Sequence, residues 1–242
     1  MFLLRIPVLY LWLAMMAGLA ILAVEVYRQG LRRTFPAFSL YVYISLAKCV
    51  ILFVTSKTLP GFTYDVAYYA GTFVHAALVT AVGVELYLKT FGTKIAAPAW
   101  VPRKTLNLVL LVIGVAFLLG LGIRATNGGR FTQAMVTCEQ IMILGSLLSL
   151  LAMAAFSRRL KISWNKTAAE IWVGFVLFLL VNSVTAFVRG SGSQIQALVA
   201  IRVGALSYIL SLAWWRWRLA TPCKDPANAA MLSYHGRQRE HS

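Results

Sequence analysis

The chain has 242 residues, of which 60% are hydrophobic and only 12% are charged. A soluble domain of this length cannot bury so much apolar surface, so this composition excludes an ordinary water-soluble domain and is typical of a membrane protein. The formal net charge of +16 is also typical of nucleic-acid-binding proteins. Here the basic residues are spread over short connections between apolar runs instead of gathering on a folded domain, so we expect no nucleic-acid partner.

Seven apolar runs follow one another along the chain, each near the ~20 residues needed to cross ~30 Å of hydrocarbon. They lie at 6–26, 38–55, 66–88, 106–123, 131–156, 168–188 and 195–215. Lipid offers the backbone no hydrogen-bond partner, so each run must be helical. The sequence therefore predicts an all-α fold, a polytopic seven-transmembrane-helix bundle over residues 1–220. All prolines fall at span ends or in connections, and Pro7 and Pro36 stand at or just before a helix start, where a missing N–H costs nothing.

A secretory signal is the alternative interpretation of the first run. Such a signal needs positive charge before its apolar stretch and a small-x-small cleavage site after it. Here the stronger basic cluster of Arg28, Arg32 and Arg33 follows the run, and the sequence AILAVEV is a poor cleavage site. We therefore expect the first helix to be retained.

The distribution of Lys and Arg predicts the orientation in the membrane. The basic set of connections and the tail carry Arg28, Arg32, Arg33, Lys89, Lys94, Arg103, Lys104, Arg158, Arg159, Lys161, Lys166, Arg216, Arg218, Lys224, Arg237 and Arg239. The opposite set carries Arg5, Lys57, Arg124, Arg130 and Arg189. We expect the amino terminus outside, the carboxyl terminus in the cytoplasm, and an inner rim that meets anionic lipid of a plasma membrane or bacterial inner membrane.

Residues 221–242 are polar and basic, and we expect a disordered cytoplasmic tail there. Cys223 lies just beyond the last apolar run, where cysteines are sometimes acylated. We favour an unmodified thiol over an acylated one.

Five polar or charged side chains interrupt the spans at a common depth. Lys48, His75, Glu139, Asn182 and Arg202 come from the second, third, fifth, sixth and seventh runs, and all lie between the midplane and the outer half when counted at ~1.5 Å per residue. A charge at the bilayer centre costs ~2.5–3.5 kcal/mol on insertion scales, so the charged members must face the bundle interior and meet partners. We expect Glu139 to pair with Arg202, with Lys48 or with both.

Further polar residues extend these positions along the helix faces. They are Tyr68, Thr72, Thr137, Gln140 and Thr185. Together the two groups predict a polar pocket that opens outward, carries excess positive charge and binds a small anionic ligand. The alternative is structural, in which interhelical hydrogen bonds and a buried ion pair fix helix register. For Lys48 a second alternative is a stem that snorkels to the outer interface.

Two carboxylates lie closer to the basic end of their spans. Glu25 precedes Arg28 and Gln29 by about one turn, and Glu85 precedes Lys89 by the same spacing. Such pairs form local salt bridges or hydrogen bonds on one helix face. We therefore expect both carboxylates to be paired within their own helices.

The sequence carries no sign of an enzyme, a metal site or a cofactor. It has no HExxH, GxSxG, GxxxxGK[ST] or GxGxxG pattern, and two of its three histidines lie in the tail. We therefore expect no catalysis, no metal and no cofactor. Three functions remain: a receptor- or sensor-like protein that acts through a partner protein, which we favour; a small transporter or channel with a 3+1+3 helix layout; and a structural or accessory subunit of a larger membrane complex.

Overall fold

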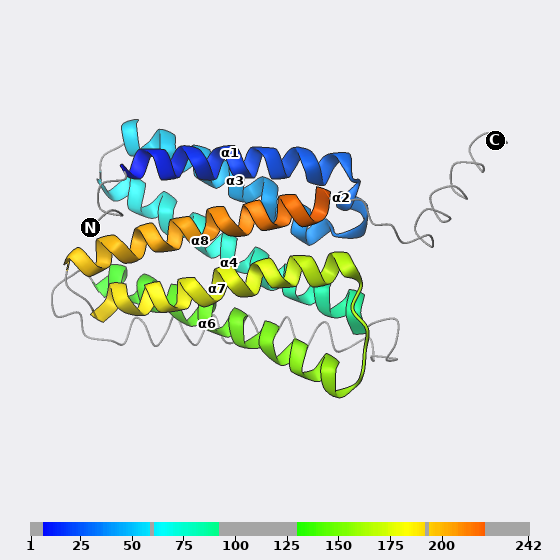
Figure 1. Ribbon diagram of the computed structural model, residues 1–242. Coiled ribbons are helices and arrows are strands. Elements are labelled where there is room, and N and C mark those ends of the chain that lie inside the picture. Colours follow the sequence, from blue (N-terminus) through cyan, green and yellow to red (C-terminus); the bar gives the residue numbers. More distant parts are fainter. Residues whose placement is uncertain (1–6, 59–60, 92–129, 192–193, 221–242) are drawn as a thin grey trace.

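The computed structural model describes residues 7–58, 61–91, 130–191 and 194–220 (Figure 1). Their helices are α1 (Val8–Arg28), α2 (Leu31–Thr34), α3 (Pro36–Thr58), α4 (Gly61–Phe91), α6 (Arg130–Arg159), α7 (Lys166–Ser191) and α8 (Gln194–Ala220). No strand occurs in these ranges, so the prediction of an all-α fold is confirmed for them.

Six of the helices are long and apolar enough to cross a membrane. They are α1, α3, α4, α6, α7 and α8, and each contains nearly all of one predicted span and extends beyond it by a few residues. The chain is thus an apolar helical bundle compatible with a multi-pass integral membrane protein. The predicted span 106–123 and the tail 221–242 lie outside the described residues.

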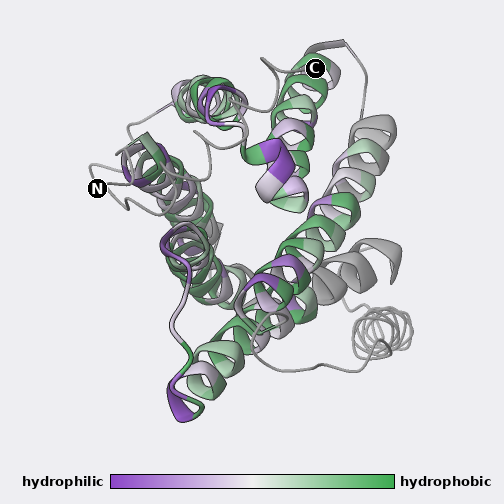
Figure 2. Ribbon diagram, turned by 90° about the vertical axis from the view of Figure 1, so that its right-hand side faces the viewer, coloured by the Kyte–Doolittle hydropathy of each residue, from purple (hydrophilic) through white to green (hydrophobic). Residues whose placement is uncertain are grey.

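The six long helices form a closed ring in which each helix packs against two neighbours. In order around the ring they are α1, α3, α4, α6, α7 and α8, and α8 returns to α1. The helices α4 and α7 also touch across the ring. Viewed from one end, much of each helix is green and purple is limited to shorter stretches, as expected of mainly apolar helices (Figure 2).

The helix directions place one set of basic residues at a single end of the bundle, on the right in Figure 1. The helices α1, α4, α6 and α8 end there, and α3 and α7 begin there. The basic residues at this end are Arg28, Arg32, Arg33, Lys89, Arg158, Arg159, Lys161, Lys166, Arg216 and Arg218. We call it the basic end; that it faces the cytoplasm remains a prediction.

Prolines and short turns mark the helix ends as the sequence predicts. Pro7 directly precedes α1, and Pro36 is the first residue of α3. Between these helices Gly30 adopts a φ of 66°, a left-handed conformation that glycine enters at little cost. At the start of α7, the Asn165 side-chain oxygen accepts a hydrogen bond of 2.9 Å from the backbone N–H of Thr167, which caps this helix.

Glu85 corrects one prediction. Its carboxylate accepts hydrogen bonds from the backbone N–H groups of Ala37 and Phe38, at 3.1 and 3.0 Å. The carboxylate of α4 thereby caps the amino-terminal end of α3, where free N–H groups and the helix dipole favour an anion. The Lys89 ammonium lies 6.0 Å from the centre of the Phe35 ring and forms no ion pair with Glu85 in the described part of the chain. For Glu25, local pairing is confirmed, because the Gln29 amide donates to it at 2.6 Å.

The core toward the basic end is an aromatic cluster between α3, α7 and α8. Trp215 is fully buried, and its ring meets those of Phe38, Tyr41 and Phe175 at centroid distances of 5.5, 6.2 and 4.8 Å. Its indole lies directly on the α7 backbone, because a Cβ added at Gly174 would be 2.1 Å from Trp215 Nε1. The same Nε1–H donates to the Ile171 carbonyl at 3.2 Å. The indole can lie this close to the α7 backbone because Gly174 has no side chain.

An ion pair adds to the α7–α8 contact at this end. The Arg218 guanidinium donates a short hydrogen bond to the Glu170 carboxylate and lies over the rings of Trp214 and Trp217 at 5.4 and 5.3 Å. It is the only ion pair in which both side chains belong to the described part of the structure. Its members are 48 residues apart, and no local spacing in the sequence predicts the pair.

Candidate functional site

A cavity of about 160 Å³ lies among α3, α4, α6 and α7. Its wall consists of Lys48, Tyr68, Thr72, His75, Ala76, Val79, Met142, Ile143, Ser146, Phe178, Leu179 and Asn182. Five of the residues predicted from the sequence are in this wall: Lys48, Tyr68, Thr72, His75 and Asn182. The structure therefore brings polar residues from three separate apolar runs into one space.

Lys48 lies in α3, and its side chain packs against α4. The ammonium donates to Thr72 Oγ1 at 3.3 Å and lies 5.7 Å from the centre of the Tyr68 ring. A Cβ added at Gly71 would lie 3.1 Å from Lys48 Cε and 3.2 Å from Cδ and Cγ. The methylene stem of Lys48 therefore packs against α4 at Gly71, where no side chain is in the way. Thr72 and Tyr68 hold the ammonium at the cavity wall.

His75 connects the cavity to the interior of the bundle. Its Nδ1 is 3.3 Å from Ser45 Oγ and its Nε2 is 3.4 Å from the Tyr41 hydroxyl, which in turn donates to the Tyr208 hydroxyl at 3.4 Å. A neutral imidazole has one donor and one acceptor nitrogen, so the two hydroxyls satisfy both. This chain of hydrogen bonds joins α3, α4 and α8.

Sequence reasoning missed Ser45 and Tyr41, although a signal was present. Tyr41, Ser45 and Lys48 are spaced by four and then three residues, which places them on one face of α3. No comparable signal in the sequence marks Gly71, because the lysine that covers it comes from another helix.

Asn182 lies between the cavity and α8. A Cβ added at Gly204 of α8 would lie 3.3 Å from the Asn182 side-chain oxygen and 3.5 Å from Thr185 Oγ1. Thr185 is buried and donates to the carbonyl of Asn182 at 3.1 Å, and Gln140 of α6 donates to the carbonyl of Ala186 at 3.0 Å. Thr185 and Gln140 therefore make helix contacts beside the cavity and are not in its described wall.

Arg202, Glu139 and Thr137 are the remaining predicted residues. Arg202 Nη1 donates to the carbonyl of Leu198 in its own helix at 3.2 Å, and Arg202 is absent from the described lining. Glu139 and Thr137 belong to α6, but their side chains lie outside the described part of the structure. The pairing expected for Glu139 stays a prediction.

The cavity lies nearer the end that is opposite the basic end. Counted at ~1.5 Å per residue, Tyr68 and Thr72 lie ~10 and ~16 Å from the start of α4 at Gly61. Lys48 lies ~15 Å from the end of α3, and Asn182 lies ~14 Å from the end of α7, by the same count. Residues from helices of opposite direction thus meet in one layer.

The wall combines a cation, neutral hydrogen-bonding groups and apolar surface. An ammonium with neighbouring hydroxyl and amide groups can bind a carboxylate, and Met142, Ile143 and Leu179 offer contact to an apolar body. The volume of about 160 Å³ is below the ~300–1,000 Å³ typical of pockets for drug-sized ligands, so the cavity suits a small ligand. Within the described residues, no three His, Cys, Asp or Glu side chains are grouped to hold a metal ion.

No protein-family model, no curated protein and no solved structure matches the chain. The function is therefore inferred from the bundle and its cavity.

Proposed function

We propose that this chain is an integral membrane protein of receptor or sensor type, which binds a small carboxylate in the cavity and acts through a partner protein. The observation that carries the proposal is the placement of Lys48. Its stem packs over Gly71, and its ammonium is fixed at the cavity wall between Thr72 and Tyr68. A cation fixed beside a space of this size supports recognition of a small anion.

The physical basis is the low dielectric of the membrane interior. An ammonium there is costly, and its attraction to an anion is much stronger than in water. The Asn182 amide and the Ser146 hydroxyl in the same wall supply neutral donors. Lysine acts as a compact point charge and does not need the two-point geometry that arginine prefers, which suits a ligand with one small carboxylate.

Two features favour a receptor over a transporter. Transporter sites are commonly built from interrupted helices, whereas α3, α4, α6 and α7 are each continuous through the level of the cavity. The cavity also lies toward the end poor in basic residues, which the Lys and Arg bias assigns to the outside. Hydrogen bonds connect the cavity to α8 through His75, Tyr41 and Tyr208. Ligand binding would act on the partner through α8.

The test is binding of small carboxylates to the purified protein. Sodium acetate, propionate, lactate and pyruvate are compared with sodium chloride, and the unfolding midpoint is measured in detergent. We expect at least one carboxylate to stabilise the protein, by about 2.7 kcal/mol at a hundredfold excess over its Kd. Lys48→Met should abolish this effect, whereas Lys89→Met removes a cation outside the cavity and should leave it intact.

Other outcomes would replace the proposal. Stabilisation that survives in Lys48→Met places the anion elsewhere. Exchange of a radiolabelled carboxylate across liposomes indicates the transporter alternative. A stoichiometric protein partner that co-purifies, together with no response to any carboxylate, indicates an accessory subunit.

A further inference from the structure

A second hollow, of about 550 Å³, lies between α1 and α8 and is separate from the cavity around Lys48. We call it the α1/α8 groove, and its lining is Gly18, Ile21, Ile209, Leu212, Ala213, Arg216, Trp217 and Ala220. The two helices touch at Gly18, where an added Cβ would lie 3.2 Å from Leu212 Cδ1. Every described lining residue except Arg216 is apolar.

The groove has the length of one leaflet of a bilayer. On α8 its lining runs from Ile209 to Ala220, which is ~16 Å at ~1.5 Å per residue. Half of a ~30 Å hydrocarbon core is about the same length. The groove therefore extends from the bundle middle to the basic end.

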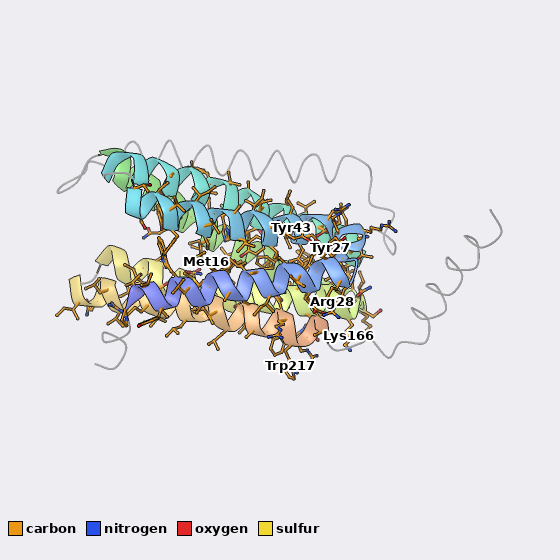
Figure 3. The ribbon with its side chains drawn as sticks, turned by 90° about the horizontal axis from the view of Figure 1, so that it is seen from above. Met16, Tyr27, Arg28, Tyr43, Lys166 and Trp217 are labelled. Atoms are coloured by element: carbon orange, nitrogen blue, oxygen red, sulfur yellow. The ribbon has the colours of Figure 1, made fainter. Side chains whose placement is uncertain are left out.

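The charged and aromatic residues of the groove lie at its basic end. Trp217 is 62% exposed and points away from the bundle (Figure 3), as indoles do at the headgroup level of a membrane. Arg216 is exposed beside it. At the other end, the described lining residues Gly18 and Ile209 are apolar.

Two arginines two residues apart in α8 have different surroundings. Arg218 binds Glu170 and covers the ring of Trp214. Arg216 lines the groove, and the described residues give it neither an ion pair nor a hydrogen bond. Its guanidinium is thus available at the mouth of an apolar groove, and it is the group that an anion at this position would meet.

We infer that the α1/α8 groove binds an acyl chain of an anionic phospholipid whose phosphate is bound by Arg216. The apolar lining accepts the hydrocarbon chain, and the guanidinium fork matches two phosphate oxygens. The basic residues at the end of α1 and in α2, namely Arg28, Arg32 and Arg33, raise the local potential and favour a headgroup with net negative charge over a zwitterionic one. A second copy in a parallel arrangement would bring another basic end to the same place, which like-charge repulsion opposes.

The experiment measures lipid retention by native mass spectrometry of the purified chain, offered equal amounts of phosphatidylglycerol and phosphatidylcholine. We expect preferential retention of one phosphatidylglycerol molecule. Arg216→Gln should lower that retention about tenfold, because it removes a charge-assisted contact. Ala213→Phe keeps the arginine but fills the groove, and it should also lower retention. Arg32→Gln is the matched control, since it removes a charge at the same end outside the groove.

Three results would overturn the inference. Equal losses in Arg216→Gln and Arg32→Gln show only diffuse attraction of anionic lipid. A loss in Arg216→Gln without one in Ala213→Phe, or displacement of the lipid by glycerol phosphate, shows a headgroup site without a chain in the groove. Cross-linked dimers that disappear in Ala213→Phe show that a second copy occupies the groove.

A second measurement uses the fluorescence of Trp217 and needs no substitution in the groove other than Trp217→Phe. Phosphatidylglycerol and phosphatidylcholine with brominated chains quench the fluorescence of nearby tryptophans. The quenching of Trp217 is obtained as the difference between the wild type and Trp217→Phe. Stronger quenching of that part by the brominated phosphatidylglycerol is expected. Equal quenching by both lipids contradicts the inference even if Ala213→Phe fails to fold.

Discussion

The two ends of the bundle are built from the same helices but packed in different ways. Toward the basic end, Trp215 lies against the backbone at Gly174, surrounded by aromatic rings, and Glu85 caps a neighbouring helix. Toward the other end, the helices leave a cavity bordered by Lys48 and His75. In the interior of the bundle, the closely packed aromatic cluster and the cavity around Lys48 are therefore separated along the helix axes, whereas the α1/α8 groove lies on the outside of the basic end.

The largest expected effect comes from Gly174→Ala. The new Cβ would overlap the Trp215 indole, with contacts of 2.1, 2.5 and 2.8 Å, and would displace a fully buried ring and its hydrogen bond to Ile171. We expect the free energy of unfolding to fall by about 3 kcal/mol, the upper range for overpacking. The measurement is thermal or denaturant unfolding in detergent.

Gly145→Ala is the control for that substitution. Gly145 also lies within a long helix, but among the described residues an added Cβ meets no atom within 4 Å. Alanine should therefore leave stability unchanged or raise it by up to about 1 kcal/mol through helix propensity. Equal effects of the two substitutions would refute the assignment of tight packing to the basic end.

Glu85→Gln should have an intermediate effect. The two carboxylate oxygens each accept one backbone hydrogen bond, from Ala37 and from Phe38, whereas glutamine has a single amide oxygen for both. The substitution also removes the negative charge that complements the start of α3. We expect a loss of about 1–3 kcal/mol, the cost of a poorly satisfied buried donor. Unfolding measurements should show a much smaller loss for Glu25→Gln, whose partner is an exposed side chain.

Gly71→Ala should have the smallest effect on stability and a clear effect on the site. The atoms that the new Cβ meets belong to the flexible Lys48 stem, at 3.1–3.2 Å, so the side chain can move aside. We expect a loss below about 1 kcal/mol. The ammonium would shift along the wall, so stabilisation by the carboxylate should weaken. Destabilisation as large as that of Gly174→Ala would show that the cavity end is packed as tightly as the basic end.

Helix positions followed from the sequence because a bilayer leaves the backbone few choices. Apolar runs of sufficient length must be helical, and Pro7 and Pro36 mark helix starts because they lack an N–H. The common depth of Lys48, His75 and Asn182 was also readable, since counting along straight helices is enough. These three residues do line one cavity.

Side-chain partners in other helices did not follow in the same way. Glu85 caps a helix that begins 49 residues earlier, and the local Lys89 was the obvious but wrong partner. Arg202 has the depth of the other polar residues but is not in the described wall of the cavity, and its Nη1 donates to the carbonyl of Leu198 in its own helix. Depth comes from counting, whereas rotation about the helix axis depends on packing with neighbours that the sequence does not reveal.

The Glu85 cap also bears on how the protein is made. Residue 85 is synthesised after all of α3, so the N–H groups of Ala37 and Phe38 have no carboxylate to accept them until most of α4 has left the ribosome. Burying them earlier in lipid would be costly. Insertion of α3 and α4 together as a helical hairpin avoids this cost, because Glu85 of α4 can then cap α3 as both helices enter the membrane.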